Sequence, residues 1–263
     1  MRNNLIMPRS IDNLIENVLG PTSKEVGVDL KNLYIKTKNN IILILKKAFK
    51  KIKNPKDGEI ANLRVVRDVF WNGSFTDEDI CAEYFGGILA SSRSKSGKND
   101  SAIFYLDIIK SLSSGQLKMH YIIYRIFNKI LINDEFKKNF FNPGNDIKVR
   151  KEKLFFTLYD ISEEFKTNDI GSIIFGLYAK NLIADGETHH YKLKNNKIIK
   201  YVEFTPSSLG IQLFAIAYNM FNNWLSFAKI DFGDFDGIKL PRIYAQTSNS
   251  LLEKIRIQYE KFL

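Results

Sequence analysis

The chain contains few of the residues that most often carry redox or metal chemistry: one cysteine and three histidines in 263 residues. The single cysteine, Cys81, cannot form a disulfide within the chain, and this favours a reducing compartment. The stretch from Met1 to Arg9 has no apolar core of the length that a secretory signal needs. From these two features we expect a cytoplasmic protein.

The sequence patterns that usually accompany catalysis are also missing. There is no Gly-x-Ser-x-Gly elbow and no glycine-rich phosphate loop. An Asp-Phe-Gly triplet starts at Asp231, but the other kinase motifs do not accompany it, and Asp234 and Asp236 do not complete the spacing of a calcium loop. Adjacent strand residues such as His189 and His190 point to opposite faces and are poorly placed to share a metal. We expect no catalytic residue, no metal and no cofactor, and therefore no enzyme.

A long apolar run without charge occurs once, over residues 205–228. Its polar side chains Gln212, Asn219, Asn222 and Asn223 would each be costly to place in hydrocarbon. We interpret the run as buried helical structure and do not expect insertion into a membrane.

Acidic residues are absent between Lys31 and Lys56, where nine lysines occur, and the net charge of the chain is +10. Such an excess is typical of proteins that bind nucleic acid or anionic membranes, although solvated lysine-rich faces would also produce it. A helix expected over 39–53 would carry apolar residues on one face, which can pack in a core or lie on a membrane. The candidate anionic-surface contacts on its other face are Lys46, Lys47, Lys50, Lys51 and Lys53.

Apolar residues recur with helical spacing through most of the first half. The spacing predicts a helix over 59–70 and three more between Thr76 and Leu131, with Thr76 capping the first of the three and Ser113 capping the last. Their stripes should be mutually buried, so we expect an N-terminal helical bundle. The residues expected to face its core include Ile80, Tyr84, Ile88, Phe104, Ile108, Leu112, Leu117, Tyr121, Tyr124 and Leu131.

The second half has a different pattern. A helix is expected over 151–161, and a second one, capped by Asn168 or Asp169, continues through Tyr178. Two short strands over 190–193 and 198–204 and a helix from Thr205 should follow. Two helices and a two-stranded ribbon are typical of a winged helix-turn-helix. The polar segment around Asn142-Pro-Gly144 is the expected boundary. We predict a helical bundle domain (1–145), a winged-helix-like α+β domain (146–228) and a C-terminal loop and helix (229–263), in a mainly α protein.

If the winged helix binds nucleic acid, its second helix would enter a groove while the ribbon reaches phosphates. Winged helices also dock proteins, so the fold alone does not choose between these partners. The candidate nucleic-acid contacts are Ser172, Tyr178, Lys180, Lys192, Lys194 and Lys197.

Several segments together resemble the Abi-alpha family, the abortive-infection-type proteins of bacteria. They are the run Gly73–Ala90 with its acidic helix start, the helix from Ala102 to Ser114, and Leu19–Leu30 with its Gly-Pro. The segments Leu177–Ile183 and Phe204–Phe214 are similar too, with one residue more than the family has between Thr205 and Gly210. The resemblance implies a cytoplasmic, non-enzymatic phage-resistance protein that acts through contacts with a protein partner or with itself.

Overall fold

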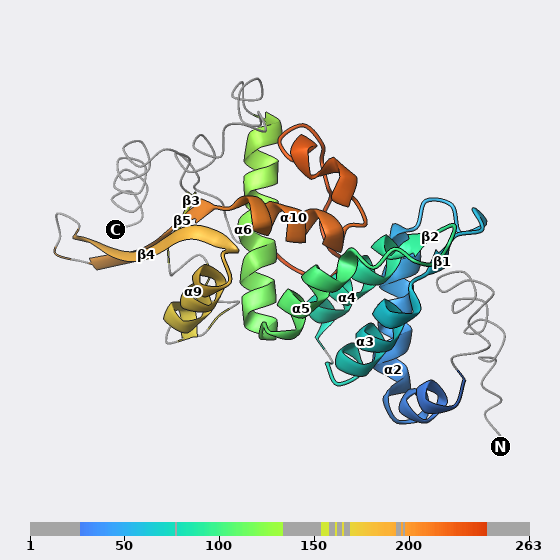
Figure 1. The fold of residues 1–263 in the computed structure, drawn as a ribbon. Helices are drawn as coiled ribbons and strands as arrows, with labels where there is room; N and C mark the ends of the chain where they lie inside the picture. Colours follow the sequence, from blue (N-terminus) through green and yellow to red (C-terminus); the bar gives the residue numbers. More distant parts are fainter. Residues whose placement is uncertain are drawn as a thin grey trace, which may run out of the picture. The chain divides into compact units, whose positions relative to one another are not determined.

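The computed structural model describes residues 27–76, 78–133, 154–157, 161, 165, 169–192, 196 and 198–240. Helices predominate and two small antiparallel sheets accompany them (Figure 1), so the expected mainly α class is confirmed. The chain divides into two compact units, one of residues 1–114 with 216–221 and one of residues 115–215 with 222–263. The boundary expected at 145/146 lies outside the described residues, as do the last 23 residues of the C-terminal loop and helix expected over 229–263.

The first unit is built around one buried helix, α4 (Asp79–Ser91), in which every residue from Ile80 to Ala90 is buried. Helices α2 and α3 pack against it, and two short strands pair next to them through Ile60 with Ser94 and Ala61 with Arg93. The other elements of this unit are α2 (Gly27–Lys51), β1 (Ile60–Ala61), α3 (Leu63–Gly73), β2 (Arg93–Ser94) and α5 (Ala102–Lys110).

Two adjacent glycines let the backbones of α4's neighbours come close. A Cβ on Gly86 would lie 2.9 Å from the backbone nitrogen of Ala48 in α2. A Cβ on Gly87 would lie 2.2 Å from the carbonyl oxygen of Ala217. Both distances are shorter than van der Waals contact, so each position excludes a side chain. The Gly-Gly pair therefore sets how closely the chain packs on two sides of α4.

Two of the expected helix boundaries are corrected. The helix predicted from Glu59 begins at Leu63, because Asn62 caps it by accepting hydrogen bonds from the backbone of Arg64 and Val65 at 3.0 and 3.3 Å. Helix α4 begins at Asp79 with Glu78 at the cap position. Thr76 does not cap it, since its hydroxyl donates back to the carbonyl of Gly73 at 2.9 Å.

The expected core stripes are confirmed on two of the three helices. Tyr84, Ile88 and Tyr124 are fully buried. Phe104 is wrongly assigned, because it is 57% exposed while Tyr105 is buried. Helix α5 is apolar on several sides, so two stripes one residue apart fit its spacing equally well and the packing chooses between them. The stripe that is buried in α5 consists of Ala102, Tyr105, Leu106 and Ile109.

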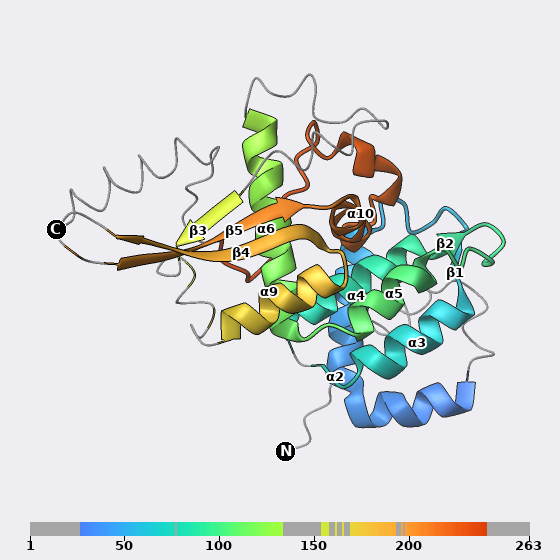
Figure 2. The ribbon, with the colours of Figure 1, turned by 60° about the vertical axis from the view of Figure 1, so that its left-hand side comes forward.

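The other described elements follow α5 in the chain, and β3, α9, β4 and β5 among them lie wholly in the second unit. The strands form an antiparallel sheet in the order β3-β5-β4, and helix α9 packs on one of its faces (Figure 2). The elements are α6 (Ser114–Asn133), β3 (Leu154–Thr157), α9 (Ile170–Ala179), β4 (Ile183–Lys192), β5 (Ile198–Pro206), α10 (Ser208–Ala217) and the 3₁₀ helix η4 (Phe221–Ser226).

The helix expected over 151–161 is wrong for residues 154–157. These residues form strand β3, which pairs with β5 from Leu154 opposite Phe204 to Thr157 opposite Tyr201. Short apolar runs fit helix and strand periodicity alike, and the available edge of β5 decides for the strand here. The two predicted ribbon strands are confirmed as far as the structure describes them, and β4 begins earlier than expected, at Ile183.

We expect Gly87→Ala to destabilise the first unit by about 1–3 kcal/mol, because the new methyl group must push against the Ala217 carbonyl rather than a flexible side chain. The measurement is chemical denaturation of the full chain. Gly171→Ala is the matched control, since nothing lies within 4 Å of its new Cβ and alanine is the better helix former. Equal stability of the two variants would contradict the close approach at Gly87.

Candidate functional site

The ribbon of the second unit presents one basic face. Cross-strand pairing sets His190 opposite Lys200 and Lys192 opposite Ile198, so these four residues share a face. Gly186, further back in β4, is on this face too, and a Cβ there would meet the Ile174 side chain of α9 at 2.7 Å. Helix α9 thus covers the inner part of this face. The outer part is solvent-exposed at His190, Lys192, Ile198 and Lys200.

Helix α9 buries one side and exposes the other. Ile170, Ile173, Ile174 and Leu177 are buried. The opposite side exposes Ser172 together with two aromatics, Phe175 at 70% and Tyr178 at 51%. We call the exposed residues of α9 and of the ribbon face together the α9–ribbon surface, which comprises Ser172, Phe175, Tyr178, His190, Lys192, Ile198 and Lys200.

The predicted contact residues fall on or beside this surface where the structure describes them. Tyr178 and Lys192 are part of it, and Lys180 is exposed at the end of α9. Ser172 is exposed, but its hydroxyl donates to the carbonyl of Asp169 at 2.8 Å and so serves its own helix. The side chains of Lys194 and Lys197 lie outside the described residues.

Four members of the surface were not predicted from the sequence: Phe175, His190, Ile198 and Lys200. Phe175 could have been found from helix spacing, because the buried positions 170, 173, 174 and 177 leave 175 facing outward. His190 and Lys200 needed the strand register, since alternation alone does not say which face α9 covers. The predicted strands were also too short to reveal the pairing.

A buried tyrosine holds the inner end of the ribbon. The hydroxyl of Tyr124 in α6 donates to the carbonyl of Leu182, just before β4, and accepts from the backbone nitrogen of Ser207, just after β5, at 3.0 Å. Burial raises the pKa of Tyr124 to about 12, so the phenol keeps its proton. Gly210 is required beside it, because a Cβ there would lie 2.0 Å from the hydroxyl. The ribbon is therefore anchored to α6 at both strands.

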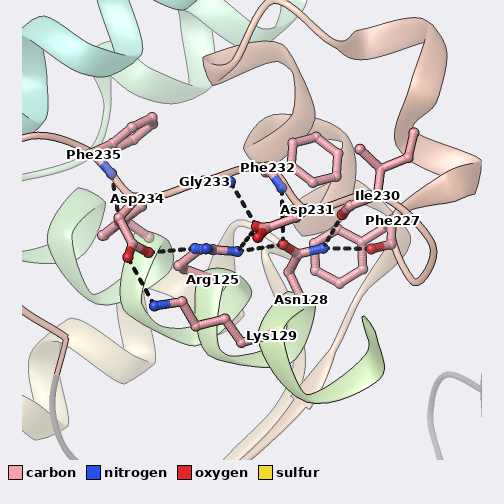
Figure 3. A network of polar contacts seen from close by, with 11 residues as sticks. Arg125, Asn128, Lys129, Phe227, Ile230, Asp231, Phe232, Gly233, Asp234 and Phe235 are labelled. Atoms are coloured by element: carbon pink, nitrogen blue, oxygen red, sulfur yellow. Dashed lines mark hydrogen bonds and ion pairs between the residues drawn. The ribbon is translucent and has the colours of Figure 1, made fainter. Parts of the chain in front are cut away.

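A second polar network fastens the segment after η4 to α6 (Figure 3). The guanidinium of Arg125 is buried and pairs with Asp231 at 2.7 Å and Asp234 at 2.6 Å. The side chain of Asn128 donates to the carbonyls of Phe227 and Ile230 at 2.6 and 2.8 Å. These contacts give the aspartates a structural role that has no need of a metal.

The hydrogen bond from the Gly233 N–H to Asp231, at 2.9 Å, and the neighbouring charge of Arg125 outweigh partial burial and lower the pKa of the Asp231 carboxyl. Among the described residues no group of three or more histidine, cysteine, aspartate or glutamate side chains is arranged to hold a metal ion. His189 lies on the sheet face opposite His190 and stacks on Tyr201, with ring centroids 5.2 Å apart.

The lysines proposed for an anionic surface divide into two groups. Lys47 and Lys51 of α2 are turned inward and both pair with the buried carboxylate of Glu83 in α4, Lys47 at 2.7 Å. A buried carboxylate requires such partners, because leaving it unpaired would be strongly unfavourable. Lys47 and Lys51 therefore cannot contact an anionic surface, and the prediction from the sequence is corrected for these two residues. Lys46, Lys50 and Lys53 are the exposed residues of that set.

One buried histidine should make the stability of the second unit depend on pH under mildly acidic conditions. His120 is fully buried on α6, its Nε2 donates to the carbonyl of Gly210 at 3.1 Å, and burial lowers its pKa to about 3. Below its ordinary pKa of 6.5, the unfolded chain therefore binds a proton that the folded chain does not. Stability contributed by neutral His120 is complete above pH 6.5 and is lost as pH falls from 6.5 towards 3.

We expect the free energy of unfolding to fall by about 1.4 kcal/mol per pH unit below pH 6.5 from this residue alone. His120→Gln keeps a donor for Gly210 and removes the titration, so its stability should vary less between pH 6.5 and 5. His190→Gln, at an exposed histidine, should keep the parent's pH dependence. If His120→Gln folds poorly, an NMR titration of the parent gives the same test, and a His120 ring that takes up a proton near pH 6 would contradict it.

Comparison with known proteins returns no family model, no curated protein and no solved structure that matches the chain. None of the described helices combines the length and the apolar content that crossing a membrane requires. The likeness to the Abi-alpha family therefore depends on the sequence segments quoted above.

Proposed function

We propose that the second unit is a winged-helix-like module and that the protein acts by contacting nucleic acid through the α9–ribbon surface. Three features support the winged-helix part. The short strand β3 comes before the other two strands of its sheet in the chain, and it pairs with the last of them, β5. Helix α9 directly precedes the ribbon, and it packs on the ribbon's inner part. A helix followed by a wing is the arrangement in which winged helices bind their partners.

The observation that carries the choice of nucleic acid is the cross-strand register. It places Lys192, Lys200 and His190 on the side of the ribbon where α9 lies. From Lys192 to Lys200 the chain has four lysines and no acidic residue. Cations in this position can neutralise phosphates, which supplies most of the affinity of non-specific nucleic-acid binding. The exposed rings of Phe175 and Tyr178 offer flat faces on which bases can stack.

Protein docking is the second candidate partner, and the aromatic face of α9 favours it. From Ile170 to Ala179 the helix has no lysine or arginine, so within the helix itself no cation can reach phosphates. Exposed Phe and Tyr side chains on one helix face are also common anchors in protein interfaces. We favour nucleic acid because the ribbon supplies the cations that α9 lacks.

The proposed mode of action is contact rather than catalysis. What supports it is that the buried ionisable side chains described above hold the fold together: Glu83 with two lysines, Arg125 with two aspartates, and His120 with Gly210. We further propose, from the Abi-alpha resemblance, that this contact serves phage resistance in a bacterial cytoplasm.

Duplex DNA should bind the full chain at low salt and dissociate steeply as salt rises. Lys192→Glu with Lys200→Glu should reduce the slope of log K against log salt by about two, because two phosphate contacts are lost. The matched control is Lys53→Glu with Lys98→Glu, which changes the net charge equally at two exposed lysines of the first unit and should change the slope much less. Absence of binding at low salt, or equal loss in both pairs, would refute this interface.

In cells, expression of the protein should lower phage plaque numbers relative to cells without it, across at least part of a broad phage panel. The Lys192→Glu, Lys200→Glu variant should restore plaque counts if the interface serves that role, provided its level in the cell matches the parent's. Equal plaque counts with and without the parent protein would contradict the proposed role in phage resistance and leave the DNA measurement to be judged separately.

A further inference from the structure

The outward side of α3 in the first unit is an exposed apolar and cationic face. Helix α3 buries Val65, Val66, Val69, Phe70 and Gly73. The side opposite these residues exposes Leu63 at 43%, Trp71 at 61% and, just past the helix end, Phe75 at 67%. Arg64 and Arg67 are exposed between them. We call these five residues, Leu63, Arg64, Arg67, Trp71 and Phe75, the α3 outer face.

The aromatic end of this face is held in place by hydrogen bonds. The backbone nitrogen and the hydroxyl of Thr76 both donate to the carbonyl of Gly73, at 3.2 and 2.9 Å. The side chain of Asn40 in α2 donates to the carbonyl of Ser74 at 2.8 Å. The rings of Trp71 and Phe75 meet edge to face with centroids 6.0 Å apart. The last turn of α3 and the turn that follows it therefore present two large rings to solvent in a fixed arrangement.

Rings held out in this way expose apolar area that folding could have buried, and such area usually marks a contact with a partner. Trp and Phe beside Leu, with arginines among them, are the composition of a surface that lies in the headgroup region of an anionic membrane. The indole suits this region because one edge is apolar and the N–H can stay hydrated. Leu63 has no flat face for a base, which disfavours a single-stranded nucleic acid here.

The charges on and around the face set its orientation. Arg67 pairs with the neighbouring Asp68 at 2.8 Å and is still largely exposed, while Arg64 extends from the first turn. Exposed Glu78 and Asp79 follow Phe75 in the chain. Attraction to anionic headgroups should therefore come from the arginines of α3, while Trp71 and Phe75 contribute apolar contact.

We propose that the α3 outer face binds the surface of an anionic membrane, with Trp71, Phe75 and Leu63 entering the headgroup layer and Arg64 and Arg67 contacting lipid phosphates. This differs from the membrane site expected on α2 from the sequence. The apolar face of α2 is buried at Ile41, Ile44 and Leu45, and two of its lysines are bound to Glu83. The membrane-binding face therefore belongs to α3 and not to α2.

The test is flotation of the full chain with vesicles of phosphatidylcholine, with and without phosphatidylglycerol. The parent should float with the anionic vesicles. Trp71→Ser with Phe75→Ser should weaken binding about tenfold or more, and Arg64→Glu with Arg67→Glu should remove the preference for phosphatidylglycerol. The matched control is Phe175→Ser with Tyr178→Ser, which removes two exposed aromatics from α9 and should bind vesicles like the parent.

Tryptophan fluorescence is a second measurement. It reports whether Trp71 enters the lipid, and correct folding alone would not produce the expected change. The chain has two tryptophans, so Trp224→Phe leaves Trp71 as the only indole. Its emission should shift to the blue with anionic vesicles and be quenched by brominated lipid. The proposal is overturned if the parent does not float, if Trp71→Ser with Phe75→Ser floats equally well, or if that variant instead changes the oligomeric state or loses DNA binding. DNA binding kept with vesicle binding absent would reject this inference alone.

Discussion

The α9–ribbon surface depends on one buried hydroxyl. Tyr124 bonds to the chain just before β4 and just after β5, and so ties both strands of the ribbon to α6. A buried backbone group without a partner would cost about 1–3 kcal/mol, and Tyr124 removes that cost at two places at once. The absent side chain at Gly210 leaves room for the phenol, and His120 donates to the carbonyl of the same glycine. The inner end of the ribbon is fixed in this way, and its cations project from the outer end.

Buried charge is handled in the same manner in both units: among the described residues, each buried lysine, arginine and glutamate side chain pairs with an opposite charge. Glu83 receives Lys47 and Lys51, and Lys51 also donates to the Glu83 carbonyl. Arg93 pairs with Asp57 and donates to the carbonyl of Glu59, and Arg125 binds two aspartates and Asn128. A lysine, arginine or aspartate that is used in this way is unavailable to a ligand. What is available for binding is the group of exposed aromatics and cations on α3, α9 and the ribbon.

Much of the fold could be predicted because apolar periodicity records which side of a helix is buried. That signal located α4, α6 and α9 and the core roles of Tyr84, Ile88 and Tyr124. This signal failed where two structural assignments fit the same residues equally well. Phe104 and Tyr105 belong to competing stripes of a helix that is apolar on several sides, and residues 154–157 read equally as helix or strand. Only part of the candidate site could be predicted, for a related reason. Lys192 and Tyr178 were predicted from the sequence, whereas Lys200 belongs to the site only because of the strand register.

The sequence by itself determined the mainly α character, the ribbon between two helices and the excess of lysine, because these follow from local spacing and composition. Only the tertiary structure decided which lysines are surface and which are core. Lys46 and Lys47 are neighbours in the chain. Lys47 is buried because it pairs with Glu83, which is distant in sequence, whereas Lys46 is exposed to solvent. The exposure of Trp71, Phe75 and Phe175 was decided in the same way. A large ring is buried or exposed according to what packs against it, and that depends on residues far away along the chain.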